Sequence, residues 1–127
     1  MRQFTVLLRN GNRTMINKKE AKQVAGAFLS QWKKADYESM FAGSTLTYRH
    51  HHSLALFKLF FSYSIASYKV LAVKPITHCV ADIKAEVGHP EGKLKVQFRL
   101  MKELAPFFPS ADGEWLISPK SFKRIGK

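Results

Sequence analysis

The segment AGAFLSQWKKADYESMF, residues 25–41, contains the clearest structural signal of the chain. Apolar side chains recur in it and just before it, with polar residues between them: Ala21, Val24, Ala25, Phe28, Leu29 and Trp32. Spacings of i, i+3, i+4, i+7, i+8 and i+11 place these side chains in one stripe along a helix. The segment therefore predicts an amphipathic helix with one buried face, and after Ala35-Asp36-Tyr37 a second short helix.

Residues that favour helix starts stand before both predicted helices. Asn17 can accept a hydrogen bond from a free amide of the first turn, and Glu20 can reach back to complete a capping box. Asp36 offers the same kind of cap to the turn that contains Tyr37. These residues predict that the first helix begins at Asn17 and the second at Asp36.

From Ser67 onward, apolar residues recur with the period of two that is typical of strands. Two sets are expected to face inward: Cys79, Ala81, Ile83, Ala85 and Val87, then Leu94, Val96, Phe98 and Leu100. Pro75 is expected to limit the strand that holds it or to mark an edge or bulge, and Pro119 to interrupt the last strand. The pattern predicts an antiparallel meander.

Two further segments complete the predicted α+β domain. Residues 4–8 and 13–16 flank Asn10-Gly11, a dipeptide favoured in type I′ turns, so residues 1–16 are expected to form a hairpin or arm. Residues 54–61 are apolar except Lys58, which predicts a helix buried on most of its surface. The chain divides into this arm, a helical part at 17–63 and a sheet at 64–127.

An aromatic first helix that ends in Trp32, the Ala35-Asp36-Tyr37 break, a third helical segment and a meander ending at residues 113–117 resemble the nuclear transport factor 2-like superfamily. The resemblance covers residues 18–125, chiefly to small members without recognised catalytic residues. It implies helices packed into a strongly bent antiparallel sheet of about four to six strands, forming a cone with an apolar pocket. It also implies dimerisation through the sheets.

Composition limits the classes of function. The 127 residues carry a net charge of +12, concentrated at the two ends of the chain, and Cys79 is the one cysteine. A field of this sign attracts phosphate-rich polymers, anionic membrane surfaces or acidic proteins, or it keeps the protein in solution. The apolar run at residues 4–8 is too short for a signal peptide or a membrane span, so we expect a cytoplasmic protein.

Enzymes of the superfamily place Asp, His or Tyr side chains inside the cone, but the inward positions predicted here are apolar. Asp82 and Glu86 have the parity of the outer face. Catalysis by a pocket Tyr, His or Asp therefore stays the alternative to a binding module for a small apolar or amphiphilic ligand or a protein partner. We expect the pocket to be lined by Phe28, Trp32, Tyr37, Tyr48, Tyr63 and Phe98.

The consecutive histidines His50, His51 and His52 do not predict a metal site. Neighbouring residues of a helix point about 100° apart, so these imidazoles cannot converge on one ion as an i, i+4 pair does. The sequence indicates no cofactor.

Surface contacts are predicted at two places. A basic stripe suited to phosphates comprises Lys93, Lys95 and Arg99, with Lys123 and Arg124 on the neighbouring strand. The alternative partners for this stripe are nucleic acid, the ribosome or an anionic membrane surface, although Phe98, which could stack on bases, is predicted to point inward. Phe107 and Phe108, between two prolines, either cap the open end of the cone or mark an association site. We favour association in a homodimer, with the Lys95 and Arg99 of one chain near Asp82 and Glu86 of the other.

Overall fold

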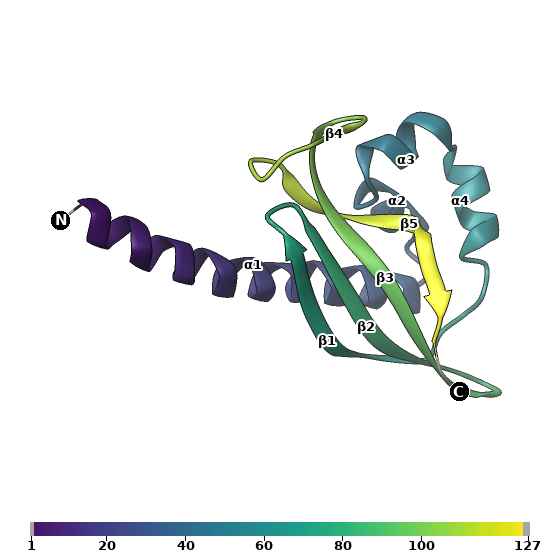
Figure 1. The fold of residues 1–127 in the computed structure, drawn as a ribbon. Helices are drawn as coiled ribbons and strands as arrows, with labels where there is room; N and C mark the ends of the chain where they lie inside the picture. The colour runs from purple at the N-terminus through teal and green to yellow at the C-terminus, as the bar shows by residue number, and fades with distance from the viewer. Residues whose placement is uncertain (1, 126–127) are drawn as a thin grey trace.

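The computed structural model describes the backbone of residues 2–125 and the side chains of residues 18–125. In these residues four helices pack against a five-stranded antiparallel sheet that does not close into a barrel, which confirms the α+β class (Figure 1). The helices are α1 (Arg2–Lys33), α2 (Tyr37–Ala42), α3 (Leu46–His51) and α4 (Leu54–Phe60). The strands are β1 (Ser67–Thr77), β2 (Val80–His89), β3 (Gly92–Ala105), β4 (Phe108–Pro109) and β5 (Glu114–Arg124).

The sheet is a meander in which β1 is an edge strand and β3 is central. Strand β2 lies between β1 and β3, and β4 and β5 both pair with β3. Ile83 is opposite Phe98 and Ala85 is opposite Val96, so the inward residues of β2 and β3 form one apolar surface. The register of β1 shifts on both sides of Pro75, an edge position where proline removes no hydrogen bond from the interior of the sheet.

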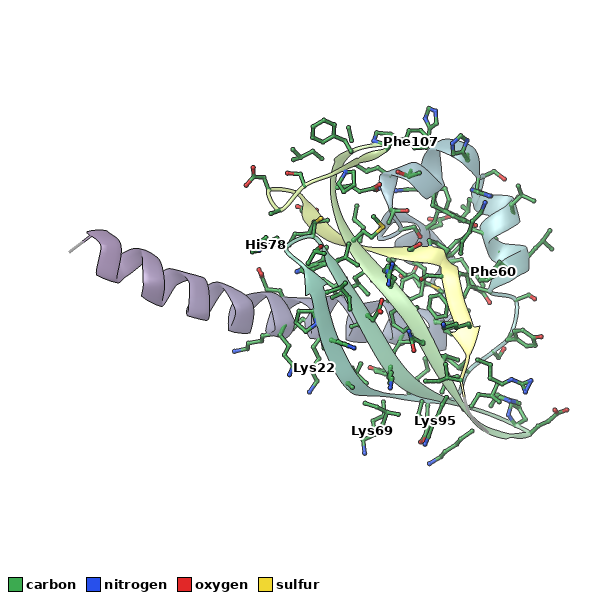
Figure 2. The ribbon with its side chains drawn as sticks, in the orientation of Figure 1. Lys22, Phe60, Lys69, His78, Lys95 and Phe107 are labelled. Carbon is green, nitrogen blue, oxygen red and sulfur yellow. The ribbon has the colours of Figure 1, made fainter. Side chains whose placement is uncertain are left out.

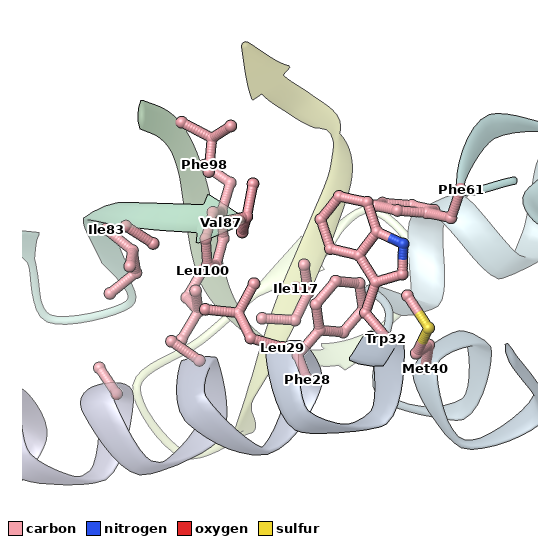
Figure 3. Packing of buried hydrophobic residues seen from close by; sticks show 14 of the residues in the cluster. Phe28, Leu29, Trp32, Met40, Phe61, Ile83, Val87, Phe98, Leu100 and Ile117 are labelled. Atoms are coloured by element: carbon pink, nitrogen blue, oxygen red, sulfur yellow. The ribbon is translucent and has the colours of Figure 1, made fainter. Parts of the chain in front are cut away.

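The predicted helical stripe is the centre of the core. Ala21, Ala25, Phe28, Leu29 and Trp32 are all buried against the sheet, as Figure 3 shows for the larger ones. The inward residues Ile83, Val87, Phe98 and Leu100 meet this stripe from the other side. The C-terminal half of α1 therefore crosses the sheet, whereas its N-terminal part projects beyond the strands (Figure 1).

A wide bulge bends β5. Residues 119–122 stand opposite Phe98 alone, because the register passes from Arg99–Ser118 to Gln97–Lys123. The Ser121 hydroxyl accepts a hydrogen bond from the Arg99 amide at 2.7 Å. Phe122 stacks on Phe98 with 4.4 Å between ring centroids. The bulge explains how Pro119 lies within the strand, and it turns the end of β5 along the core (Figure 1).

Each short helix begins at a capping side chain. The Asp36 carboxylate accepts from the Ser39 amide and hydroxyl, which confirms the predicted start of α2. At the start of α3 the Thr45 hydroxyl accepts from the Tyr48 amide, and at the start of α4 the Ser53 hydroxyl accepts from the Leu56 amide. Helices of six or seven residues have little stability of their own, so these caps and the core contacts fix their positions.

The prediction of an N-terminal hairpin at residues 1–16 is wrong for the described backbone. Helix α1 begins at Arg2, so Asn17 and Glu20 lie within it and do not form a helix start. Adding residues to a helix that has already formed costs little, whereas an isolated two-stranded hairpin is marginal in water. The local turn preference of Asn10-Gly11 is therefore outweighed.

Two other expectations about burial are wrong. Of the side chains in α4, Phe57 is fully buried, whereas Leu56, Leu59 and Phe60 are exposed. A helix of seven residues that rests on the core through one residue per turn leaves the others outside. Cys79 lies half-buried in the β1–β2 turn beside Thr77 and does not extend the inward face of β2.

Candidate ligand pocket

A pocket of about 830 Å³ opens at the end of the sheet where the β2–β3 turn approaches the loop after α4. Its apolar wall comes from five segments of the chain that are distant in sequence: Trp32, Phe61, Ile65, Val87, Val96 and Phe122. The fold brings them together because α1 ends here, α4 leads into the loop, and the bend of β5 directs its last residues to the same place.

The wall is held by aromatic packing. Trp32 meets Phe61 edge-to-face at 5.1 Å between ring centroids, and Phe61 meets Phe122 in the same way, also at 5.1 Å. The Trp32 Nε1 donates to the carbonyl oxygen of Tyr63 at 2.9 Å. Because this donor already has its acceptor, the indole presents a non-polar surface to the pocket.

The rim of the pocket is cationic. Lys93, Lys123 and Arg124 line it and are exposed. Lys93 lies 3.7 Å from Glu86, and Glu91 is the one acidic residue among those that line the pocket. For Lys123 and Arg124 the described side chains show no ion pair within 4.0 Å. The pocket thus joins an apolar wall to a basic edge.

The six sequence-predicted pocket residues divide into three pairs. Trp32 and Tyr63 line the pocket. Phe28 and Phe98 fill the core behind it, because the rings of Phe57, Phe61 and Phe122 pack against Phe28 and close the interior of the cone.

Tyr37 and Tyr48 lie away from the pocket. Tyr37 packs at the margin of the core. Tyr48, on α3, is buried and stacks on His52 at 4.2 Å. Burial raises the pKa of the Tyr48 phenol above its ordinary value.

The residues of the predicted basic stripe also lie in different places: Lys93, Lys123 and Arg124 are at the pocket rim, whereas Lys95 and Arg99 are not. Arg99 makes a two-point ion pair with Asp82 of its own chain, at 2.8 and 3.3 Å, and this hydrogen bonding raises the pKa of the guanidinium. Lys95 lies on the outer face of β3, at the lower edge of Figure 2. Since Asp82 and Glu86 both have basic partners within the chain, they are already engaged before any partner subunit arrives.

Phe107 and Phe108 lie at the opposite end of the molecule from the pocket rim. Both are more than half exposed, and Phe107 stands at the top of Figure 2, on the β3–β4 turn. The Phe107 ring meets the rings of His50 and His51 at 5.8 and 5.2 Å. Because both phenylalanine side chains are exposed, Phe107 and Phe108 do not cap the core. An association site at this end stays a prediction.

Sequence reasoning missed a buried carboxylate behind this turn. Glu103 accepts hydrogen bonds from the Thr47 amide, at 3.2 Å, and from the Thr47 hydroxyl. Thr47 in turn accepts from the Phe107 amide at 2.7 Å. Alternation along β3 places Lys102 inward, but α3 covers the strand end and buries Glu103. In the sequence, the only signal was that Thr47 stands near a helix start, and this did not indicate that Glu103 would be its hydrogen-bond partner.

The described histidines and acidic residues are scattered over the fold. No group of three His, Cys, Asp or Glu residues among the described side chains is placed to hold a metal ion. His50 and His51 pack against each other, at 5.1 Å between ring centroids, and against Phe107, whereas His52 stacks on Tyr48, so the three imidazoles do not converge on one point. A second pocket of about 240 Å³, lined by Trp115 and Lys18, lies by the β1–β2 turn.

Comparison with known proteins leaves the pocket as the main guide to function. The sequence matches no protein-family model and no curated protein. None of the helices in the described residues has the length and apolar content needed to cross a membrane.

Proposed function

We propose that this protein is a non-catalytic binding module whose pocket takes a small amphiphilic ligand with an apolar tail and an anionic head group. The observation that carries the proposal is the arrangement of the pocket, in which an apolar aromatic wall ends at a rim of Lys93, Lys123 and Arg124. Two sets of residues predicted separately, for a pocket and for anion binding, contribute to this one site.

The size of the pocket suits such a ligand. A volume of about 830 Å³ lies within the range of roughly 300–1,000 Å³ found for small-molecule sites. Burial of an alkyl chain contributes about 0.8 kcal/mol per CH₂ group. The exposed basic rim adds electrostatic attraction for the head group, which salt weakens.

Binding is favoured over catalysis by the placement of the titratable groups. His89 and Glu91 lie in the exposed β2–β3 turn, where the His89 Nδ1 accepts from the Glu91 amide at 3.3 Å. The apolar wall offers no carboxylate or imidazole to a reacting atom. Membership of the nuclear transport factor 2-like superfamily is part of the proposal, supported by helices packed on a bent sheet with a pocket at one end.

Titration with dodecanoate and dodecanol, each below the concentration at which it aggregates, tests the proposal. We expect Lys123→Glu/Arg124→Glu to weaken dodecanoate binding about tenfold, since each exposed charge contact contributes up to about 1 kcal/mol, and to leave dodecanol binding unchanged. Leu94 is half-buried and lines the pocket, so the larger side chain of Leu94→Trp should fill part of the pocket and weaken the binding of both dodecanoate and dodecanol.

The matched control for charge is Lys74→Glu/Lys84→Glu, which changes net charge equally on exposed positions outside the pocket. Equal loss of dodecanoate binding in this control, or no binding by the unaltered protein, would refute a head-group site at the rim.

We also propose a homodimer that uses the exposed Phe107 and Phe108, together with Leu104 beside them. Exposed aromatic side chains in one turn are typical of association sites. The variant Phe107→Gly/Phe108→Ser should lower the mass seen by sedimentation at tens of micromolar. Gly suits Phe107 because its φ is +64°, so the turn itself is retained. A monomer before substitution would refute the dimer.

A further inference from the structure

An apolar face lies exposed on α4 and on Tyr63, three residues beyond its end. Leu56 is 52% exposed, Leu59 72%, Phe60 50% and Tyr63 75%. Phe60, which projects from α4 in Figure 2, also lines the pocket together with Tyr63. The apolar face is therefore continuous with the mouth of the pocket. Leu56 and Leu59 stand outside the pocket lining, one helical turn apart.

Basic side chains lie on α4 and at the pocket mouth, where this apolar face ends. Lys58 is exposed on α4 itself, and Lys93, Lys123 and Arg124 stand across the pocket mouth. At the pocket mouth, Glu91 is the one acidic residue of the lining, and Glu86 pairs with Lys93 at 3.7 Å. Cations therefore outnumber anions at the pocket mouth, where the apolar face ends.

We propose that α4, Tyr63 and the basic rim form a docking face for an anionic lipid bilayer. A second copy of the chain placed here would bring like charges together, in a protein whose net charge is +12. Nucleic acid would match the charge but would leave the aliphatic side chains of α4 without an apolar environment. An anionic bilayer surface supplies both acyl chains and negative head groups.

The dimensions of α4 fix how it would meet the bilayer. Seven residues rise about 10 Å, far short of the roughly 30 Å hydrocarbon core, so α4 lies in the plane of the interface. Its exposed side chains would enter the head-group boundary, which interfacial helices penetrate by about 5–10 Å. Docking in this orientation turns the mouth of the pocket toward the lipid. The docking face stands without the ligand proposed above.

Vesicle binding of the full chain tests the docking face, using phosphatidylcholine vesicles with and without phosphatidylglycerol. We expect binding to require phosphatidylglycerol. We expect Leu56→Ser/Leu59→Ser to lower the partition coefficient about tenfold or more, because two apolar side chains lose their burial in the interface. Leu71→Ser/Ile76→Ser, at exposed positions of β1, is the matched control and should bind as the unaltered protein does.

A local probe separates insertion of α4 from attraction by the basic N-terminal residues. We expect brominated acyl chains to quench the added fluorescence of Leu59→Trp, and to leave that of Leu71→Trp unchanged. None of the substituted positions, 56, 59, 71 and 76, lines the ligand pocket, so dodecanoate binding in solution should persist in all of these variants. Vesicle binding and dodecanoate binding therefore report separately on the docking face and on the ligand pocket, so failure of one proposal can be told from failure of the other.

Several outcomes would overturn the docking face. They are absence of vesicle binding, equal loss in the β1 control, and no quenching at position 59. A fourth is that Leu56→Ser/Leu59→Ser abolishes a dimer seen by sedimentation without lipid, which would assign the face to a second copy. A fifth is loss of affinity for single-stranded DNA in that variant, which would assign the face to nucleic acid.

Discussion

Two backbone positions near the end of α1 hold residues that suit their conformation poorly. Gly26 is in the helix interior, where a methyl group would meet nothing within 4 Å. Ala35 follows the helix with φ +57°, and the Asp36 and Ala35 amides donate to Gln31 and Trp32 in a Schellman-type ending. Alanine is therefore favoured in place of Gly26, and glycine in place of Ala35.

We therefore predict that exchanging glycine for alanine at position 26 and alanine for glycine at position 35 both stabilise the protein. Gly26→Ala should raise the free energy of unfolding by about 0.5–1 kcal/mol, since alanine has the higher helix propensity. Ala35→Gly should raise it by a similar amount, because the left-handed region is strained for alanine. Denaturant unfolding measures both. Ala27→Gly, at an exposed helical position, is the control and should destabilise by about 1 kcal/mol.

Trp32 serves both the core and the pocket. Its ring packs on Phe61 and Phe122, and its Nε1 donates to Tyr63. We predict that Trp32→Ala lowers the free energy of unfolding by about 3–5 kcal/mol, as loss of a large buried aromatic does. Trp32→Phe keeps much of the packing and should cost less. A denaturant midpoint that Trp32→Ala leaves unchanged would contradict the observed burial.

At the scale of elements, Glu103 joins β3 to α3. Its carboxylate is the acceptor for both polar groups of Thr47, within a region where Glu103 and Thr45 are buried. We predict that Glu103→Ala lowers the free energy of unfolding by about 1–3 kcal/mol, because the Thr47 donors lose their acceptor. Glu103→Gln retains an acceptor and should lose less. Equal effects of the two changes would show that the side-chain volume matters and the hydrogen bonds do not.

The start of α2 should make stability depend on acid. Hydrogen bonds from the Ser39 hydroxyl and amide hold the pKa of Asp36 below its ordinary value of 3.8. A carboxylate with a lowered folded pKa contributes stability above its unfolded pKa and loses that contribution as the pH falls through the folded pKa. Replacing Asp36 by Asn should therefore flatten the fall in unfolding midpoint below about pH 4. An unchanged acid profile would argue against this cap.

Elements differ in how far the sequence predicts them. The stripe of α1 from Ala21 to Trp32 and the alternation of β2 and β3 were predictable, because most of the inward side chains in these stretches are buried. Helix α4 was misjudged because an apolar run reports composition and not which neighbours are present to cover it. The start of α1 was misjudged because Asn17 is a capping residue by type, while the preceding residues extend the helix.

At the scale of the whole molecule, the fold separates two kinds of surface. One end holds the pocket and its basic rim, and the other holds the Phe107 turn against α3, while the exposed face of α4 runs from α3 toward the pocket mouth (Figure 1). The sequence indicated an apolar pocket and a basic stripe. That they meet follows from the bulge of β5, which carries Lys123 and Arg124 to the pocket mouth. A four-residue bulge has no recognisable pattern beyond Pro119.

The most direct test of the pocket is the change in backbone amide chemical shifts during titration with dodecanoate. The account predicts that saturable shifts concentrate in three segments around the pocket, residues 60–65, 87–96 and 122–124, and that Lys123→Glu/Arg124→Glu weakens the titration. Amides of the far end, including Thr47 and Phe107, should stay unchanged. Shifts centred on those residues, or none that saturate, would contradict the assignment of this pocket as the ligand site.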